Sequence, residues 1–133
     1  GHGVEQSYSE ALKYYQQAAY KGYSTAQFNL GLMYHNGQGV EQSYTEALKY
    51  YQQAADQGNY DAQFSLGSLY ERGQGVEPSY SEALKYYQQA AEQGHSVAQF
   101  FVTQLKRKLK FEYDEEANKK RRISPRNKSM SGI

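Results

Sequence analysis

A repeated unit of 36 residues constrains the fold of this chain more than any other feature. Residues 26–61 and 62–97 are identical at 25 of their 36 positions. Residues 1–25 match the second half of a further copy, and residues 98 to about 110 match a degraded first half. A fixed period of this length predicts supersecondary units that stack and cover one another's apolar faces. The sequence therefore indicates a repeat array.

A glycine turn divides each unit into two predicted helices. Its sequence is GQGV at Gly37–Val40 and Gly73–Val76, and GHGV at Gly1–Val4. Two closely spaced glycines interrupt a helix and permit a positive φ. A Ser-x-x-Glu capping box follows each turn and predicts a helix start. The boxes are Ser7/Glu10, Ser43/Glu46 and Ser79/Glu82.

Apolar residues at helical spacing fill the segments between these signals. In one copy the stripe consists of Tyr44, Ala47, Leu48, Tyr51, Ala54 and Ala55. Left-handed C-terminal caps are predicted at Gly22, Gly58 and Gly94. Asn59 and His95 can cap the helices that follow. Gly31 and Gly67 fall inside helices, where glycine costs about 1 kcal/mol against alanine. We expect them to allow close approach to the alanine pairs of the partner helix.

The expected fold class is all-α, a right-handed α-solenoid of antiparallel helix pairs. Phe101, Leu105 and Leu109 recur every fourth residue and would let one helix cover the last repeat. Two full copies with two halves are near the minimum for a stable array, so we expect a piece of a longer one. The expected segments are a half repeat at 1–25, full repeats at 26–61 and 62–97, a capping helix at 98–118 and a basic disordered tail at 119–133.

The pattern of the two copies resembles the Sel-one-like repeat (SLR) family, a relative of the tetratricopeptide repeat. In the first copy the matching residues are Ala26, Leu30, Gly31, Tyr34, Gly37, Gly39, Val40, Ala47, Tyr50, Tyr51, Ala54, Ala55 and Gly58. The second copy carries them 36 residues later, and the resemblance covers roughly residues 1–105. It implies an α-solenoid with roles in scaffolding and complex assembly.

Two departures from the family pattern have different consequences. Ser43 and Ser79 stand where the family often has Asp, and both residue types cap helices, so the fold is unaffected. In the last half-unit Val102, Thr103 and Lys106 replace the Leu, Gly and Tyr of the motif. This replacement suggests that the array ends there.

The sequence offers little for catalysis or for binding a metal or cofactor. It has no Cys, which excludes disulfides and thiolate zinc sites. His2, His35 and His95 lie near turns or helix ends, which is typical of exposed histidines. The acidic residues 114–116 lack the glycine of a calcium loop, and the GQGV turns lack the Gly-Lys-Ser/Thr ending of a phosphate loop. Tyrosine pairs at helical spacing favour a core position over ligand stacking. They are Tyr14/Tyr15, Tyr50/Tyr51 and Tyr86/Tyr87. We expect a protein that is not an enzyme and needs no cofactor.

A partner surface is expected on the first helix of each repeat, which usually lines the concave face of a solenoid. Framework positions are identical between the copies, whereas positions 29/65, 32/68, 35/71 and 36/72 differ. Such differences could be tuned to a protein or peptide, or could reflect drift on a solvated surface. The candidate partner-binding residues are Gln27, Asn29, Leu32, Gln63, Ser65, Ser68 and Glu71.

The charge of the chain is unevenly distributed. Residues 1–105 contain 5 Lys and Arg against 10 Asp and Glu, and residues 106–133 contain 10 against 4. Lys106-Arg107 and the cluster Lys119, Lys120, Arg121 and Arg122 fit a bipartite nuclear-import pattern. Ser124 is a candidate phosphosite, and a phosphate there would weaken the basic cluster. The alternative function is therefore a basic-tailed module that binds nucleic acid or an acidic partner through residues 106–128. A purely solubilising tail is the competing interpretation.

The location and assembly of the chain are predicted only in outline. A protein or peptide partner is favoured over nucleic acid. No run of residues is apolar enough to cross a membrane. We expect an intracellular protein, cytoplasmic or nuclear, although an N-terminal targeting sequence could be missing. We also expect a monomer unless the open N-terminal repeat face associates with itself.

Overall fold

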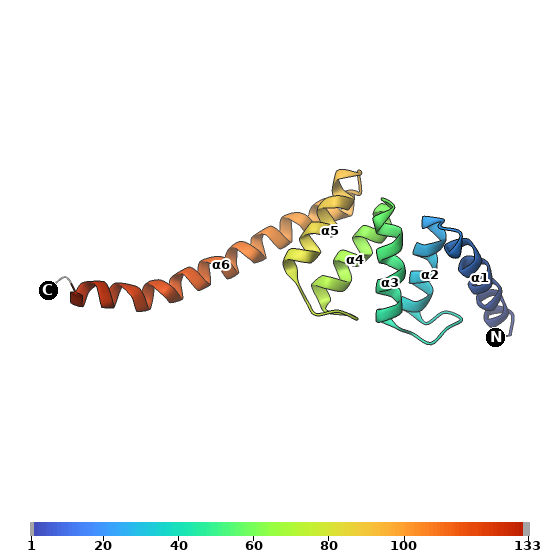
Figure 1. Cartoon of the computed structure of the whole chain (residues 1–133), viewed down its shortest axis with the longest axis horizontal. Helices are drawn as coiled ribbons and strands as arrows, with labels where there is room; N and C mark the ends of the chain where they lie inside the picture. The colour runs from blue at the N-terminus through green and yellow to red at the C-terminus, as the bar shows by residue number, and fades with distance from the viewer. Residues whose placement is uncertain (1, 132–133) are drawn as a thin grey trace.

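Six helices follow one another along the chain in this computed structural model, which describes the backbone of residues 2–131 and the side chains of residues 3 and 7–122. They are α1 (His2–Tyr20), α2 (Ser24–Asn36), α3 (Tyr44–Asp56), α4 (Tyr60–Arg72), α5 (Tyr80–Glu92) and α6 (Ser96–Ser131). Each helix packs against its neighbours in sequence, so the chain forms a row of helix pairs (Figure 1). The α-solenoid fold is confirmed.

Three short connections have the helix caps that the sequence predicts. They join α1 to α2, α3 to α4 and α5 to α6. Gly58 has φ +89, and the amide of Asn59 donates to the Ala54 carbonyl at 3.1 Å. This is the left-handed cap expected for a helix that ends in glycine. The Asn59 side chain then accepts from the Ala62 amide at 2.9 Å. In the next repeat His95 Nδ1 accepts from the Ala98 amide at 3.1 Å, which confirms that His95 caps α6.

Only half of the predicted capping box is formed at Ser43/Glu46 and at Ser79/Glu82. Ser43 Oγ accepts from the Glu46 amide at 3.1 Å, as predicted. The Ser43 amide, however, donates to the Tyr34 carbonyl at 2.9 Å and therefore does not bind the Glu46 side chain. Ser79 repeats both contacts in the next unit. The serine thus caps its own helix and also ties its turn to the preceding helix.

The turn predicted at Gly1–Val4 is wrong for the residues that the structure describes. Helix α1 begins at His2, so Gly3 and Ser7 lie inside it and the box at Ser7/Glu10 does not start a helix. The other two GQGV turns each follow a helix, which Gly37 or Gly73 ends with φ +68. At Gly3 the same motif lies within the first turn of α1 and does not interrupt the helix.

The glycines inside the helices make room for tyrosine rings. A Cβ on Gly31 would lie 2.6 Å from Tyr51 Cδ1, and one on Gly67 would lie 2.6 Å from Tyr87 Cδ1. The expected close approach is real, but the group that enters is a tyrosine ring and not an alanine pair. Tyr51 and Tyr87 are fully buried, and burial raises the pKa of both hydroxyls well above its ordinary range. The core role predicted for the tyrosine pairs is confirmed for these two rings, whereas it is wrong for Tyr14, which is exposed.

Helix α6 is longer than the sequence indicated. Its first turns cover α5 with Val102 and Leu105, as predicted for a capping helix. Helices α2 and α4, the first helices of the two full repeats, end at Gly37 and Gly73. In α6 the residue in register with these glycines is Leu109, so no glycine ends the helix there. Residues 112–122 are mostly good helix formers and include no Gly or Pro. The backbone is helical to Ser131, which differs from the helix end expected at 118 and the disorder expected for 119–133 (Figure 1).

Candidate protein-interaction surface

Gln27 and Gln63, two of the candidate partner-binding residues, are part of the repeat framework. Both are buried, and Gln27 Nε2 donates to the Ala19 carbonyl at 3.3 Å. Gln57 Nε2, from the same unit as Gln27, donates to Gln27 Oε1 at 2.6 Å, so Gln27 connects the Ala19 carbonyl of the preceding unit with the end of α3. Gln63 makes the corresponding contacts with Ala55 and Gln93. These side-chain amides already hold successive units together, so the expectation that they face a partner is wrong.

Three more candidates lie beside the buried tyrosines. Ser65 lies near the Tyr51 hydroxyl and Ser68 near the Tyr87 hydroxyl, where each opposes the rise in the pKa of its tyrosine that burial causes. Glu71 Oε1 accepts a hydrogen bond from the Tyr87 hydroxyl at 2.8 Å, and Lys108 Nζ donates to Glu71 Oε2 at 3.3 Å. Leu32 is half-buried and packs against the core, whereas Asn29 is half-buried on α2. The structure therefore leaves Asn29 and Leu32, with parts of Ser65 and Ser68, for a partner.

The differences between the copies at positions 35/71 have an internal explanation. His35 stands where Glu71 stands in the next unit, and its Nδ1 lies 3.3 Å from the Tyr51 hydroxyl. Burial, together with the charge of Arg72, lowers the pKa of His35. Lys108 follows Arg72 in register and forms an ion pair with Glu71. Each of the two residues thus contacts a tyrosine of its own unit and faces a cation of the next unit.

The Glu71→Lys variant is expected to lose about 2 kcal/mol of unfolding free energy, because it removes the Tyr87 acceptor and places a second cation beside Lys108. Urea unfolding followed by circular dichroism measures the change. Glu71→Gln keeps an acceptor for Tyr87 and should lose less. Glu77→Lys, at an exposed turn residue, is the matched charge reversal and should leave stability nearly unchanged. Equal stability of Glu71→Lys and Glu77→Lys would show that this network contributes nothing.

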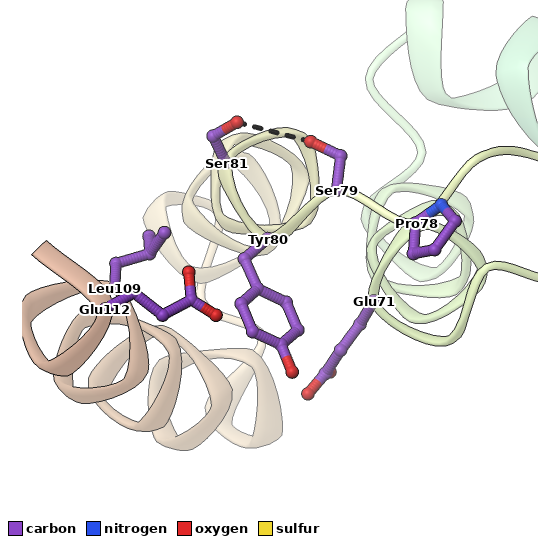
Figure 2. A pocket seen from close by; sticks show the side chains of 7 residues that line it. All are labelled: Glu71, Pro78, Ser79, Tyr80, Ser81, Leu109 and Glu112. Atoms are coloured by element: carbon purple, nitrogen blue, oxygen red, sulfur yellow. Dashed lines mark hydrogen bonds between the residues drawn. The ribbon is translucent and has the colours of Figure 1, made fainter. Parts of the chain in front are cut away.

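An open hollow of about 400 Å³ lies where α4, α5 and α6 meet. Tyr80 projects into it, and the carboxylates of Glu71 and Glu112 flank its ring (Figure 2). Ser79 Oγ and Ser81 Oγ lie 3.2 Å apart at its rim. The lining residues are Glu71, Pro78, Ser79, Tyr80, Ser81, Leu109 and Glu112. Apart from Glu71, the sequence analysis did not select these residues, although Leu109 in the place of a turn glycine was a visible signal.

The basic cluster of the sequence analysis lies on α6. Lys119, Lys120, Arg121 and Arg122 are all exposed there. Ser124 lies outside the described side chains, so its role as a phosphosite stays a prediction. The backbone around the cluster is helical, although an import receptor binds an extended chain.

The two histidines with described side chains make contacts within the fold. His35 contacts Tyr51, and His95 stacks on Phe64 with ring centroids 4.7 Å apart while capping α6. His2 lies outside the described side chains. Within residues 3 and 7–122, no group of three His, Cys, Asp or Glu side chains is placed to hold a metal ion. No helix among the described residues combines the length and apolar character of a membrane span.

Comparison with known proteins agrees with this architecture. The model of the Sel1 repeat matches residues 1–23, 24–59 and 61–95. No curated protein sequence matches the chain closely enough to count as a relative. Proteins built from this repeat typically mediate protein interactions and are generally non-catalytic scaffolds.

Several solved structures are similar to the chain. A Sel1 repeat protein from Oxalobacter formigenes is 43% identical with a TM-score of 0.69, over 71% of this chain and 39% of that protein. The protective antigen c5321 from uropathogenic Escherichia coli, which displays an SLR fold, is 42% identical with a TM-score of 0.67, over 68% and 19%. Cysteine-rich protein B from Helicobacter pylori is 26% identical with a TM-score of 0.65, over 68% of each chain. The chain therefore spans well under half of the first two proteins. With its three matched repeats and its helix-pair architecture, the chain belongs to the Sel1 repeat family.

Proposed function

We propose that this chain is a non-catalytic adaptor that holds a protein or peptide partner on the face formed by α2 and α4, which we take as the concave face. One observation carries the proposal. Within α2 and α4, the positions that are identical in the two repeats are used by the core and the glutamine contacts, whereas positions 29/65 and 32/68 differ and remain partly exposed. Residues that packing does not require are free to be selected by a partner.

The test uses a double variant in which Asn29 and Ser65 are both replaced by arginine. Long arginine side chains can reach water from half-buried positions, so the fold should survive while the face is blocked. Partners recovered with the intact chain should bind the double variant at least about tenfold more weakly, a loss of about 1.4 kcal/mol. Gln53→Arg, at an exposed position of α3, is the control and should bind normally. Normal binding by a folded double variant would exclude this face.

The basic cluster supports a second candidate function, which is binding of nucleic acid or an acidic partner through residues 106–128. Its support is the exposure of Lys119, Lys120, Arg121 and Arg122 on α6. Binding through such a cluster falls steeply between about 50 and 200 mM salt, whereas binding to an uncharged face persists. Replacing the four residues with glutamine should abolish the salt-sensitive binding only. Binding that survives both salt and these replacements belongs to the α2–α4 face.

A further inference from the structure

The start of each second helix supports the glycine turn of the following repeat. A Cβ on Gly39 would lie 3.0 Å from Tyr8 Cβ and 3.1 Å from its carbonyl oxygen, near the start of the repeated part of α1. Gln38 Nε2 also donates to the Tyr8 hydroxyl at 3.3 Å. In the next unit a Cβ on Gly75 would lie only 2.7 Å from the Tyr44 carbonyl carbon. Both contacts bring backbone against backbone, and glycine is the residue that permits them.

At the third such position, Tyr80, this turn is missing. Tyr80 follows Tyr44 by one repeat, and the residues in register with Gly73 and Gly75 are Leu109 and Phe111. The two glycines have φ +68 and +73, which leucine and phenylalanine rarely adopt. Residues 109–111 therefore continue α6 as a helix and form no turn.

The place that the turn would fill remains open as the hollow around Tyr80 (Figure 2). Its lining includes the first residues of α5, Tyr80 and Ser81, which correspond to the contact residues Tyr44 and Thr45. Pro78 and Leu109 add apolar surface. Tyr80 also lines a second hollow of about 400 Å³ together with Phe111, two-thirds of whose surface is accessible. The surface around Tyr80 that corresponds to the turn contacts at Tyr8 and Tyr44 is the third turn seat. Its lining combines apolar groups with two carboxylates and two serine hydroxyls, and the described residues leave it open.

We propose that this turn seat binds a Gly-x-Gly-Val turn from a partner protein, in the manner in which Tyr8 and Tyr44 hold the turns of this chain. The inference rests on the proposed function, since it names one kind of segment that such an adaptor would hold. The occupant follows from continuity with the two existing contacts. A glycine is needed where backbone meets backbone, and the valine supplies an apolar group that matches the half-buried Val40 and Val76.

A second copy of this chain is a poorer occupant. Its own turns already lie against Tyr8 and Tyr44. The outer face of α6 is also closed to another second helix, because Thr103 occupies the position at which Gly31 and Gly67 admit a tyrosine ring.

The test uses a cyclic peptide with the sequence of residues 70–79, YERGQGVEPS, added to the whole chain at about 1 mM. Amide signals of Tyr80, Ser81 and Leu109 should shift in the NMR spectrum. A peptide in which alanine replaces the second glycine should bind at least about tenfold more weakly, because its Cβ would meet the α5 backbone. Ser81→Trp, which fills the seat, should abolish the shifts. Ser96→Trp, at an exposed residue outside it, should leave them unchanged.

Three outcomes would overturn the inference. Shifts confined to Asn29, Ser65 and their neighbours would place the peptide on the α2–α4 face, which retains the proposed function without this seat. Absence of any shift, with partner binding still sensitive to the Asn29 and Ser65 replacements, would have the same meaning. Sedimentation that shows concentration-dependent dimers blocked by Ser81→Trp would identify the occupant as a second copy.

Discussion

Replacement of Tyr87 by alanine is expected to lower the unfolding free energy by about 3–5 kcal/mol. The ring is 1% exposed and lies between α4, α5 and α6, where it contacts Phe64 and Phe101 at centroid distances of 5.3 and 5.2 Å. Its loss leaves a cavity beside Gly67, which has no side chain to fill it. An array of this size has few interfaces to share the loss. Denaturant unfolding measures the change, and the helical signal at room temperature reports whether the C-terminal units remain folded.

Two controls separate the ring of Tyr87 from its hydroxyl. Tyr87→Phe keeps the ring and removes only the bond to Glu71, so it should cost about 1 kcal/mol. Tyr14→Ala changes the same residue type at a position that is 68% exposed and should cost much less than Tyr87→Ala. If Tyr87→Ala and Tyr14→Ala had equal effects, the ring would not be a core element.

Replacement of Gly75 by alanine is expected to cost about 2–4 kcal/mol, from a strained φ and from overpacking together. The new Cβ would lie 2.7 Å from the Tyr44 carbonyl carbon and 2.8 Å from the Thr45 nitrogen. Neither atom can rotate away, because both belong to the backbone at the start of α3. The turn would have to lift from the preceding repeat, so the two units should uncouple. Two unfolding transitions in place of one, or a lower urea midpoint, would reveal this.

Gly58→Ala is the matched control for this contact. Gly58 has φ +89, but a Cβ there would meet nothing within 4 Å. The variant therefore carries the backbone strain without the collision and should cost about 1 kcal/mol. If Gly75→Ala and Gly58→Ala were equally destabilising, the contact between the Gly75 turn and the start of α3 would not contribute to stability.

The contacts that the sequence predicted correctly are mostly those between residues close together along the chain. The caps at Ser43, Asn59 and His95, and the positive φ of Gly58, depend on residues within a few positions of one another. These contacts can be inferred from residue types and spacing. The prediction failed at Gly3, where the motif lies inside α1 and does not interrupt it, and at the end of α6, where a run of good helix formers continues past 118.

The candidate site could be predicted less well from the sequence, for a different reason. Gln27 and Glu71 are polar residues on the first helix of a repeat, which favours a surface role. Their partners, Gln57 and Lys108, lie 30 and 37 residues away. A local pattern does not show that a polar group is bound by the other helix of its own unit, as Gln27 is, or by the next unit, as Glu71 is. The register of Leu109 with Gly73 was visible, but its consequence, an open seat at Tyr80, requires the packing of three helices.

The repeat by itself determined the helices, their order and most of their ends, because periodicity and caps act over a few residues and recur in each copy. The packing of neighbouring helices and units decided which polar side chains are hydrogen bonded inside the array. It also decided which tyrosine ring lies against Gly31 or Gly67 and which turn seat stays open. The physical reason is that burial and backbone contact depend on groups a full period apart. Two nearly identical units therefore expose different surfaces at the two ends of the stack.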